Sequence, residues 1–140
     1  MQDSGLQSLK QWQTNGDSMT GTEVKKFAEM IVALLKFAVE HPEKEQIDSE
    51  TPIKGSKIAE RFNLRFGTDY DDSDVRQAVN FSRSTLKQPV CSSCKGYWFA
   101  RNKSEWDSTT SGLKSRISEM QSAITGGDRY WLDPGMFPNE

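Results

Sequence analysis

Residues 24 to 38 constrain the fold most strongly, because apolar side chains recur there at the spacing of an amphipathic helix. The stripe consists of Val24, Phe27, Ala28, Ile31, Leu34, Leu35 and Ala38. Positions three and four apart share one face of a helix, so the pattern predicts a core helix of about five turns. Thr20-Gly-Thr-Glu23 has the spacing of a capping box, and the proline of His41-Pro42 ends the helix.

Two shorter helices are expected in the polar middle of the chain. The first follows Ser56, whose hydroxyl would cap it. Its apolar residues are Ile58, Ala59, Phe62 and Leu64. The second covers SDVRQAVNFSRSTLK, residues 73–87, after a cap at Asp71 or Asp72. Its core-facing stripe is Val75, Ala78, Val79, Ser82 and Leu86.

The pattern becomes extended after Pro89. Val90-Cys91, a polar turn at Ser92-Ser93 and the aromatic stretch from Lys95 to Ala100 are typical of a β-hairpin. Ile53 lies between Pro52 and Gly55 and is placed to add a third short strand. The expected fold class is therefore mainly α with a small β-hairpin (α+β).

A C-terminal helix is predicted from Ser104, where Ser104-x-x-Asp107 resembles a capping box, to a stop at Gly126-Gly127. Its apolar residues follow a heptad spacing with one polar member, Thr110. We expect Trp106, Leu113, Ile117, Met120 and Ile124 to form a dimer interface. Packing of the same seam on the first helix of its own chain is the alternative.

The expected organisation is one domain with tails, as the length of 140 residues suggests. It comprises a flexible leader (1–19), a folded domain (20–103), a dimerisation or packing helix (104–125) and an aromatic tail (126–140). No apolar run is long enough for a membrane span, and the first residues lack a secretory pattern. We therefore expect a soluble, cytoplasmic protein.

Charge is distributed unevenly along the chain. Residues 1–51 carry a net charge of −4, residues 52–103 carry +5, and residues 104–140 carry −3. The overall charge of −2 thus hides a basic middle between two acidic flanks. A basic middle favours binding to nucleic acid, whereas the acidic flanks favour binding to a protein.

Two observations bear on catalysis, cofactors and metals. The single histidine, His41, stands at a helix end, and no phosphate loop or carboxylate motif is present, so we expect a non-enzymatic protein without a cofactor. Cys91-x-x-Cys94 resembles one knuckle of a zinc ribbon, but a structural zinc needs four ligands and the chain has no second pair. A site shared between two subunits stays open, and a redox pair in a hairpin is disfavoured.

The sequence IKGSKIAERFNLRFG…SDVRQAVNFSRS…VCSSCKGYWFA, together with the order of the expected elements, resembles the winged helix-turn-helix family. The similarity covers residues 20–125 and is greatest to small winged-helix proteins of phages and mobile elements. It implies that the hairpin is the wing and that the helix over residues 73–87 is the recognition helix. Winged-helix regulators often form dimers through a terminal helix, which the resemblance also implies here.

The resemblance implies a set of DNA-binding residues on this layout. Arginine, glutamine and asparagine read base edges, whereas lysine and serine hold phosphates. The expected set is Lys54, Lys57, Ser73, Arg76, Gln77, Asn80, Arg83, Ser84, Lys87, Lys95 and Arg101. Arg61 and Arg65 add positive charge to the preceding helix, although a polar face is also what any solvent-exposed amphipathic helix shows.

The sequence therefore predicts a duplex-DNA-binding homodimer that acts in phage or mobile-element transcription or replication, within the host cytoplasm. The alternative is an adaptor or inhibitor on the same scaffold, which would bind a host protein through the acidic flanks and the tail YWLDPGMFP. Neither prediction involves a membrane.

Overall fold

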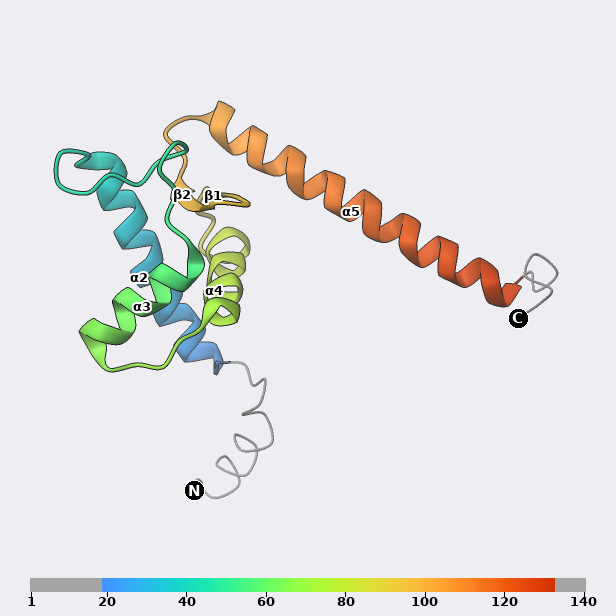
Figure 1. The fold of residues 1–140 in the computed structure, drawn as a ribbon, viewed down its shortest axis with the longest axis horizontal. Helices are drawn as coiled ribbons and strands as arrows, with labels where there is room; N and C mark the ends of the chain where they lie inside the picture. Colours follow the sequence, from blue (N-terminus) through green and yellow to red (C-terminus); the bar gives the residue numbers. More distant parts are fainter. Residues whose placement is uncertain (1–18, 133–140) are drawn as a thin grey trace, which may run out of the picture. The chain divides into compact units, whose positions relative to one another are not determined.

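The computed structural model describes residues 19–132, which form four helices and one antiparallel hairpin (Figure 1). In chain order these are α2 (Gly21–Glu40), α3 (Gly55–Phe66), α4 (Asp72–Ser84), β1 (Val90–Ser93), β2 (Gly96–Phe99) and α5 (Lys103–Leu132). The chain is thus mainly helical with a small hairpin, as the sequence predicts. The expected leader, except for Met19, and residues 133–140 of the expected tail lie outside the described range.

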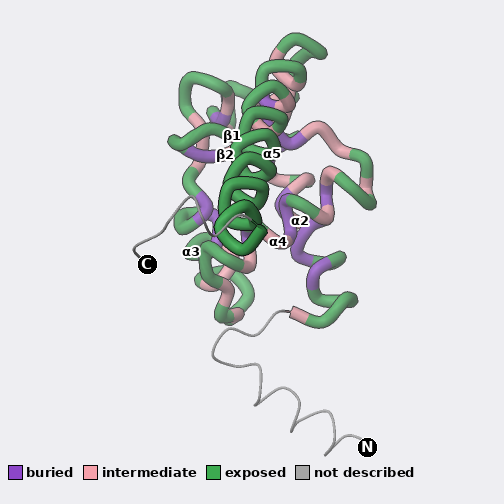
Figure 2. The backbone as a smooth tube through the Cα atoms, turned by 90° about the vertical axis from the view of Figure 1, so that its right-hand side faces the viewer, coloured by how far each residue is buried: buried purple, intermediate pink, exposed green. Residues whose placement is uncertain are grey.

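The chain divides into two compact units between Arg101 and Asn102. The first unit contains α2, α3, α4 and the hairpin, and every buried hydrophobic residue of the described range lies in it, between Val24 and Trp98. Figure 2 shows this distribution, with buried positions on α2, α4 and the hairpin and exposed positions along α5. No helix in residues 19–132 has the length and apolar character needed to cross a membrane.

Helix α2 forms the centre of the first unit, and its predicted boundaries are confirmed. The Thr20 side chain and Glu23 form the capping box, and the N–H of His41 donates to the Phe37 carbonyl at the other end. The apolar stripe is buried except for Leu34, which is half-buried. A residue that the sequence pattern did not predict, Ile47 of the acidic loop, is also in the core, with 3% exposed.

Helices α3 and α4 pack on α2 and differ from the prediction at three points. Ser56 is not the cap of α3, because the helix already begins at Gly55 and no side chain caps it. Leu64 is 81% exposed, since it projects away from the core. Helix α4 ends at Ser84, so Leu86 lies beyond it and is only half-buried, whereas the predicted cap at Asp71 is confirmed.

The hairpin pairs Val90 with Phe99 and closes with Ser93 opposite Gly96. The predicted turn at Ser92-Ser93 is wrong, because both serines belong to β1 and the turn consists of Cys94 and Lys95. The predicted contribution of Ile53 is confirmed by an antiparallel bridge to Tyr97. The N–H of each residue donates to the carbonyl of the other, at 3.0 and 2.8 Å.

Helix α5 is longer than the sequence predicts. The stop at Gly126-Gly127 is wrong, because the helix continues through both glycines to Leu132. The capping box from Ser104 is also wrong, since the Asn102 side chain accepts the N–H of Glu105 and caps the helix. The first residues of the expected tail are therefore helical, and α5 has 30 residues.

Candidate nucleic-acid interface

The exposed face of α4 carries most of the residues of this helix that were predicted to contact DNA. Ser73, Arg76, Asn80 and Ser84 are exposed and Gln77 is half-buried. The opposite face is buried in the core through Val75, Ala78, Val79 and Ser82. The Ser82 hydroxyl donates to the Ala78 carbonyl at 2.9 Å, so the only polar residue of that stripe is satisfied within the helix. The division of α4 into a core face and a solvent face is as predicted, except at Arg83 and at Leu86, which lies beyond the helix.

Arg76 lies at the centre of this exposed face and forms an ion pair with Asp72, one turn earlier. The distance from Nη1 to Oδ2 is 2.8 Å, and the side chains are 62% and 50% exposed. An exposed pair at this spacing contributes only about 0.3–0.5 kcal/mol. Because the pair is weak, Arg76 is able to exchange the carboxylate for another acceptor.

A solvent-open hollow of about 520 Å³ brings together the start of α3, the start of α4 and the hairpin turn. Its charged lining residues are Lys54, Asp72, Arg76 and Lys95. The three cations, Lys54, Arg76 and Lys95, come from positions up to 41 residues apart in the sequence. The hollow therefore has three positive side chains and one negative side chain at its walls.

Gly55 allows the elements around this hollow to approach one another. A Cβ on Gly55 would overlap Oδ1 of Asp72 and would lie 3.4 Å from the Tyr97 ring. The uncapped N–H groups at the start of α3 lie next to Ser56 and Lys54, and helix starts carry partial positive charge. This corner therefore combines the positive charge of Lys54 and of the helix start with the negative charge of Asp72.

Arg83 does not belong to the exposed reading face. Its Nε donates to the Val90 carbonyl at 2.8 Å and its Nη2 donates to the Ser92 hydroxyl at 2.9 Å. The side chain is half-buried and joins α4 to β1. The prediction that Arg83 faces solvent is wrong, because a helical wheel of α4 does not include the strand that follows it.

Three other predicted DNA-binding residues lie outside the hollow. Lys57 is exposed on α3 and pairs with Glu60 at 3.3 Å. Lys87 is exposed in the loop after α4, where its φ of 58° is unusual for a residue with a side chain. Arg101 follows β2 and donates to the Ser49 hydroxyl at 2.9 Å. The structure thus gathers only part of the predicted basic set.

Arg61 and Arg65, which were expected to add to the basic surface, line a different feature. They border an apolar groove of about 450 Å³ between α2 and α3 that includes Leu34, Phe37 and Phe66. Arg61 forms an ion pair with Glu45, and Arg65 lies 5.7 Å from the centre of the Phe66 ring. These contacts direct both guanidinium groups to the groove and its rim.

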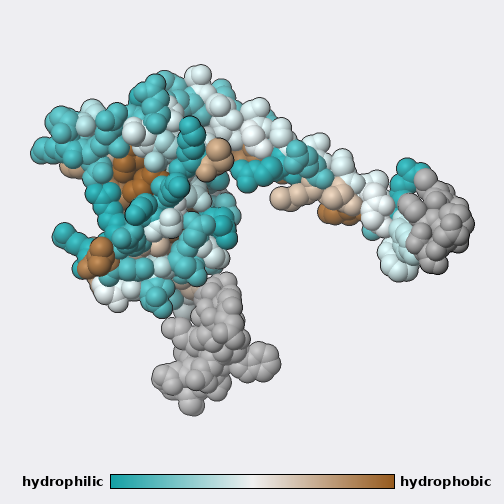
Figure 3. All heavy atoms as spheres, viewed as in Figure 1, coloured by the Kyte–Doolittle hydropathy of each residue, from teal (hydrophilic) through white to brown (hydrophobic). Residues whose placement is uncertain are grey.

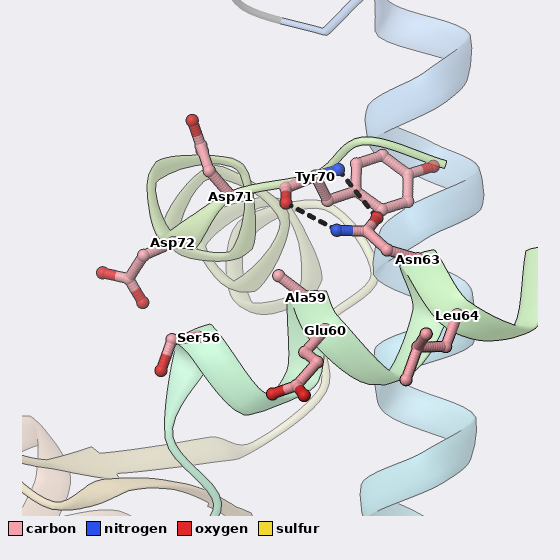
Figure 4. A pocket seen from close by; sticks show the side chains of 8 residues that line it. All are labelled: Ser56, Ala59, Glu60, Asn63, Leu64, Tyr70, Asp71 and Asp72. Atoms are coloured by element: carbon pink, nitrogen blue, oxygen red, sulfur yellow. Dashed lines mark hydrogen bonds between the residues drawn. The ribbon is translucent and has the colours of Figure 1, made fainter. Parts of the chain in front are cut away.

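Helix α3 and the loop that leads to α4 line a hollow of about 460 Å³ that the sequence did not predict (Figure 4). Asn63 fixes this loop, because its Oδ1 accepts the N–H of Tyr70 at 2.8 Å and its Nδ2 donates to the Tyr70 carbonyl at 2.9 Å. The Tyr70 ring stacks on Phe27 with 3.8 Å between ring centres. Burial raises the pKa of Tyr70 above its ordinary value, and Glu23 and Asp74 raise it further.

The cysteines occupy different environments in the hairpin. Cys91 is fully buried opposite Trp98, whereas Cys94 is exposed at the turn. Within residues 19–132, no group of three or more His, Cys, Asp or Glu side chains has the arrangement of a metal site. One thiol of the Cys-x-x-Cys pair is therefore buried and the other is exposed.

The predicted dimer residues are graded in exposure along α5. Trp106 and Leu113 are half-buried, whereas Ile117, Met120 and Ile124 are 64%, 62% and 58% exposed. Trp131 and Leu132, beyond the predicted stop, are 79% and 80% exposed.

Comparison of the chain with protein-family models, curated proteins and solved structures gave no match.

Proposed function

We propose that this chain is a non-enzymatic duplex-DNA-binding protein on a winged helix-turn-helix scaffold. The observation that carries the proposal is the hollow where Lys54, Arg76 and Lys95 meet beside the exposed face of α4. The bridge between Ile53 and Tyr97 supports the scaffold assignment, because it adds a third short strand to the hairpin. In this proposal α4 is the recognition helix and the hairpin is the wing.

Each residue of the proposed interface has a distinct role. Lys54 and Lys95 bind phosphates on either side of the start of α4, which fixes the position of the helix on the duplex. Arg76, Gln77 and Asn80 then face the base edges, where arginine pairs with guanine and the amides pair with adenine. Arg83 positions the wing relative to α4 through Val90 and Ser92 and does not itself read DNA.

The proposed biological role is regulation of transcription or replication in a phage or mobile element, in the host cytoplasm and as a homodimer. This role combines the resemblance to small winged-helix proteins with the exposed apolar residues of α5. Two subunits with two-fold symmetry would match a two-fold DNA site.

Retardation of labelled promoter or origin fragments at low salt tests the DNA-binding proposal. Arg76→Ala should weaken binding by roughly 5- to 150-fold, the cost of one bidentate base contact. Lys36→Ala, which removes an exposed positive charge from α2, is the matched control and should leave the affinity within about two-fold. Failure of the unaltered chain to retard any fragment would contradict the proposal.

A protein-binding adaptor or inhibitor is the second candidate. The observation in its favour is the exposed end of α5, where Trp131 and Leu132 belong to the C-terminal segment of net charge −3. Large exposed apolar side chains of this kind mark interaction surfaces. Recovery of one host protein by the full chain, and its loss when residues 128–140 are removed, would support the adaptor; DNA retardation unaffected by that truncation would count against it.

A further inference from the structure

The C-terminal two thirds of α5 are exposed in the single chain. Every residue from Lys114 to Leu132 is exposed, and Figure 3 shows apolar side chains on this helix surface. The helix also contains Gly112, Gly126 and Gly127, each of which costs about 1 kcal/mol relative to alanine. Because most helical stability in proteins comes from packing of an apolar face, a second helix that covers this stripe would stabilise α5.

The apolar stripe has a chemically distinct residue type at each of its two heptad positions. Taking Thr110 as position a, all a residues of the predicted seam are β-branched: Thr110, Ile117 and Ile124. The d residues of the same seam are unbranched at Cβ: Trp106, Leu113 and Met120. The observed extension of α5 continues this register through Gly127 at d to Trp131 at a.

This division of residue types indicates how many helices pair. Among parallel coiled coils, β-branched residues at a combined with leucine at d favour two strands. We propose that α5 pairs with α5 of a second copy in this parallel, in-register arrangement. The proposal rests on the dimer proposed above and specifies the direction and register of its two helices.

The polar member of the seam does not oppose this pairing. The Thr110 hydroxyl donates to the Asp107 carbonyl of its own helix at 2.9 Å. Its hydrogen-bonding group is therefore satisfied without a partner chain. The methyl group of Thr110 is then available to pack at position a.

The charges beside the seam favour the parallel direction. In a parallel pair, each g residue approaches the e residue five positions later in the partner, which joins Arg116 to Gln121 and Ala123 to Asp128 in the exposed part of the helix. None of these pairs has two like charges. An antiparallel pair with full overlap would instead place Asp107 next to Asp128 of the other helix twice, which is repulsive.

The parallel direction has a consequence for the proposed DNA interface. Both helices begin at Lys103, so the two first units are attached at the same end of the coil, about 10 Å apart at the helix axes. In an antiparallel pair the attachment points would be separated by about 45 Å, the length of the 30-residue helix. Only the parallel pair attaches both first units at the same end of the coil.

Cysteine cross-linking of the full chain tests the direction. Cys94, the exposed thiol, is first changed to serine, and buried Cys91 is retained. Leu113→Cys and Ile124→Cys are then prepared as separate variants and oxidised alone and as an equal mixture. Ser122→Cys, at the outer f position, is the matched control and should not cross-link.

A parallel coil predicts that each seam variant alone becomes a covalent dimer of twice the 15.9 kDa chain mass. The mixture should give no mixed species, because residues 113 and 124 are about 16 Å apart along a parallel pair. Cross-linking in the mixture alone would show an antiparallel pair and overturn the proposal. A chain that stays monomeric by light scattering would also overturn it.

DNA retardation with the same uncross-linked samples separates this inference from the proposed function. A monomer or antiparallel dimer that still retards DNA contradicts only the parallel coil. A parallel dimer that never retards DNA contradicts only the DNA-binding function.

Discussion

Gly96 determines the shape of the hairpin at a single position. Its φ is 144°, which residues with a side chain rarely adopt, and its position is opposite Ser93 at the hairpin turn. A Cβ at this site would lie 2.6 Å from the backbone carbon of Ile53, which cannot move without breaking the bridge to Tyr97. The third strand of the sheet thus depends on the absence of one methyl group.

We expect Gly96→Ala to lower the free energy of unfolding by about 1–3 kcal/mol, because it combines backbone strain with a backbone clash. Gly112→Ala is the matched control, since no atom lies within 4 Å of a Cβ there and alanine favours the helix. Denaturant unfolding followed by circular dichroism measures both values. Equal effects of the two substitutions would contradict the role given to Gly96.

Asp48 stabilises the loop that leads into Ile53. The Thr51 hydroxyl donates to its carboxylate at 2.8 Å, and the N–H groups of Glu50 and Thr51 both donate at 2.9 Å. The hydroxyl of Thr51 is the largest cause of a pKa below the ordinary value of 3.8, and burial partly opposes it. The carboxylate form is therefore more stable in the folded chain than in the unfolded chain.

Because the folded pKa is lowered, the contribution of Asp48 is present above pH 3.8 and is lost as the pH falls through the folded pKa. Asp48→Asn should lower the free energy of unfolding by about 1 kcal/mol at pH 7. The difference from the unaltered chain should shrink below the ordinary pKa of Asp48. Urea unfolding at a series of pH values measures this difference, and a constant difference at all pH values would contradict the assignment.

At the scale of elements, Arg76 and Arg83 have separate functions although both belong to α4. Arg83 joins α4 to β1 through two hydrogen bonds, so Arg83→Ala should lower the free energy of unfolding by about 1–3 kcal/mol. Arg76→Ala removes only an exposed ion pair and should change stability by less than about 0.5 kcal/mol. Thermal unfolding of both variants tests the distinction; a reversed order of stability would refute it.

The elements that the sequence predicted well have local signals. Thr20 and Glu23 mark the start of α2, and Asp71 marks the start of α4, because capping depends on residues only three positions apart. The end of α5 has no such signal, since glycine lowers helix stability without forbidding the helix, and the chain continues through Gly126 and Gly127.

The candidate site could be predicted only in part for the same reason. The solvent face of α4 follows from periodicity, but the hollow depends on how three elements separated in sequence approach one another. The contacts of Arg83 with β1 and of Arg61 with Glu45 are also tertiary, so a helical wheel does not contain them. The sequence identifies the basic residues, but the surface on which each one lies depends on these tertiary contacts.

The two units should be separable. The described buried hydrophobic residues all belong to the first unit, so a fragment ending at Arg101 should retain cooperative unfolding. It should be monomeric. It should also bind DNA roughly 100-fold more weakly than the full chain, because it lacks the α4 helix of a second, linked subunit. Size measurement and DNA retardation check these outcomes; a fragment with full affinity would show that α5 is not required for binding.

The ion pair between Arg76 and Asp72 has a consequence for how such a protein would search a genome. Any DNA approaching α4 meets the Asp72 carboxylate, which repels phosphate whatever the sequence, whereas a matching base edge gives Arg76 a better partner. The repulsion by Asp72 therefore lowers the affinity for every DNA site, whereas the contact of Arg76 raises the affinity only for matching sites. A basic interface with one carboxylate at its centre would spend less time on incorrect sites and would make its first encounter more slowly than one without the carboxylate.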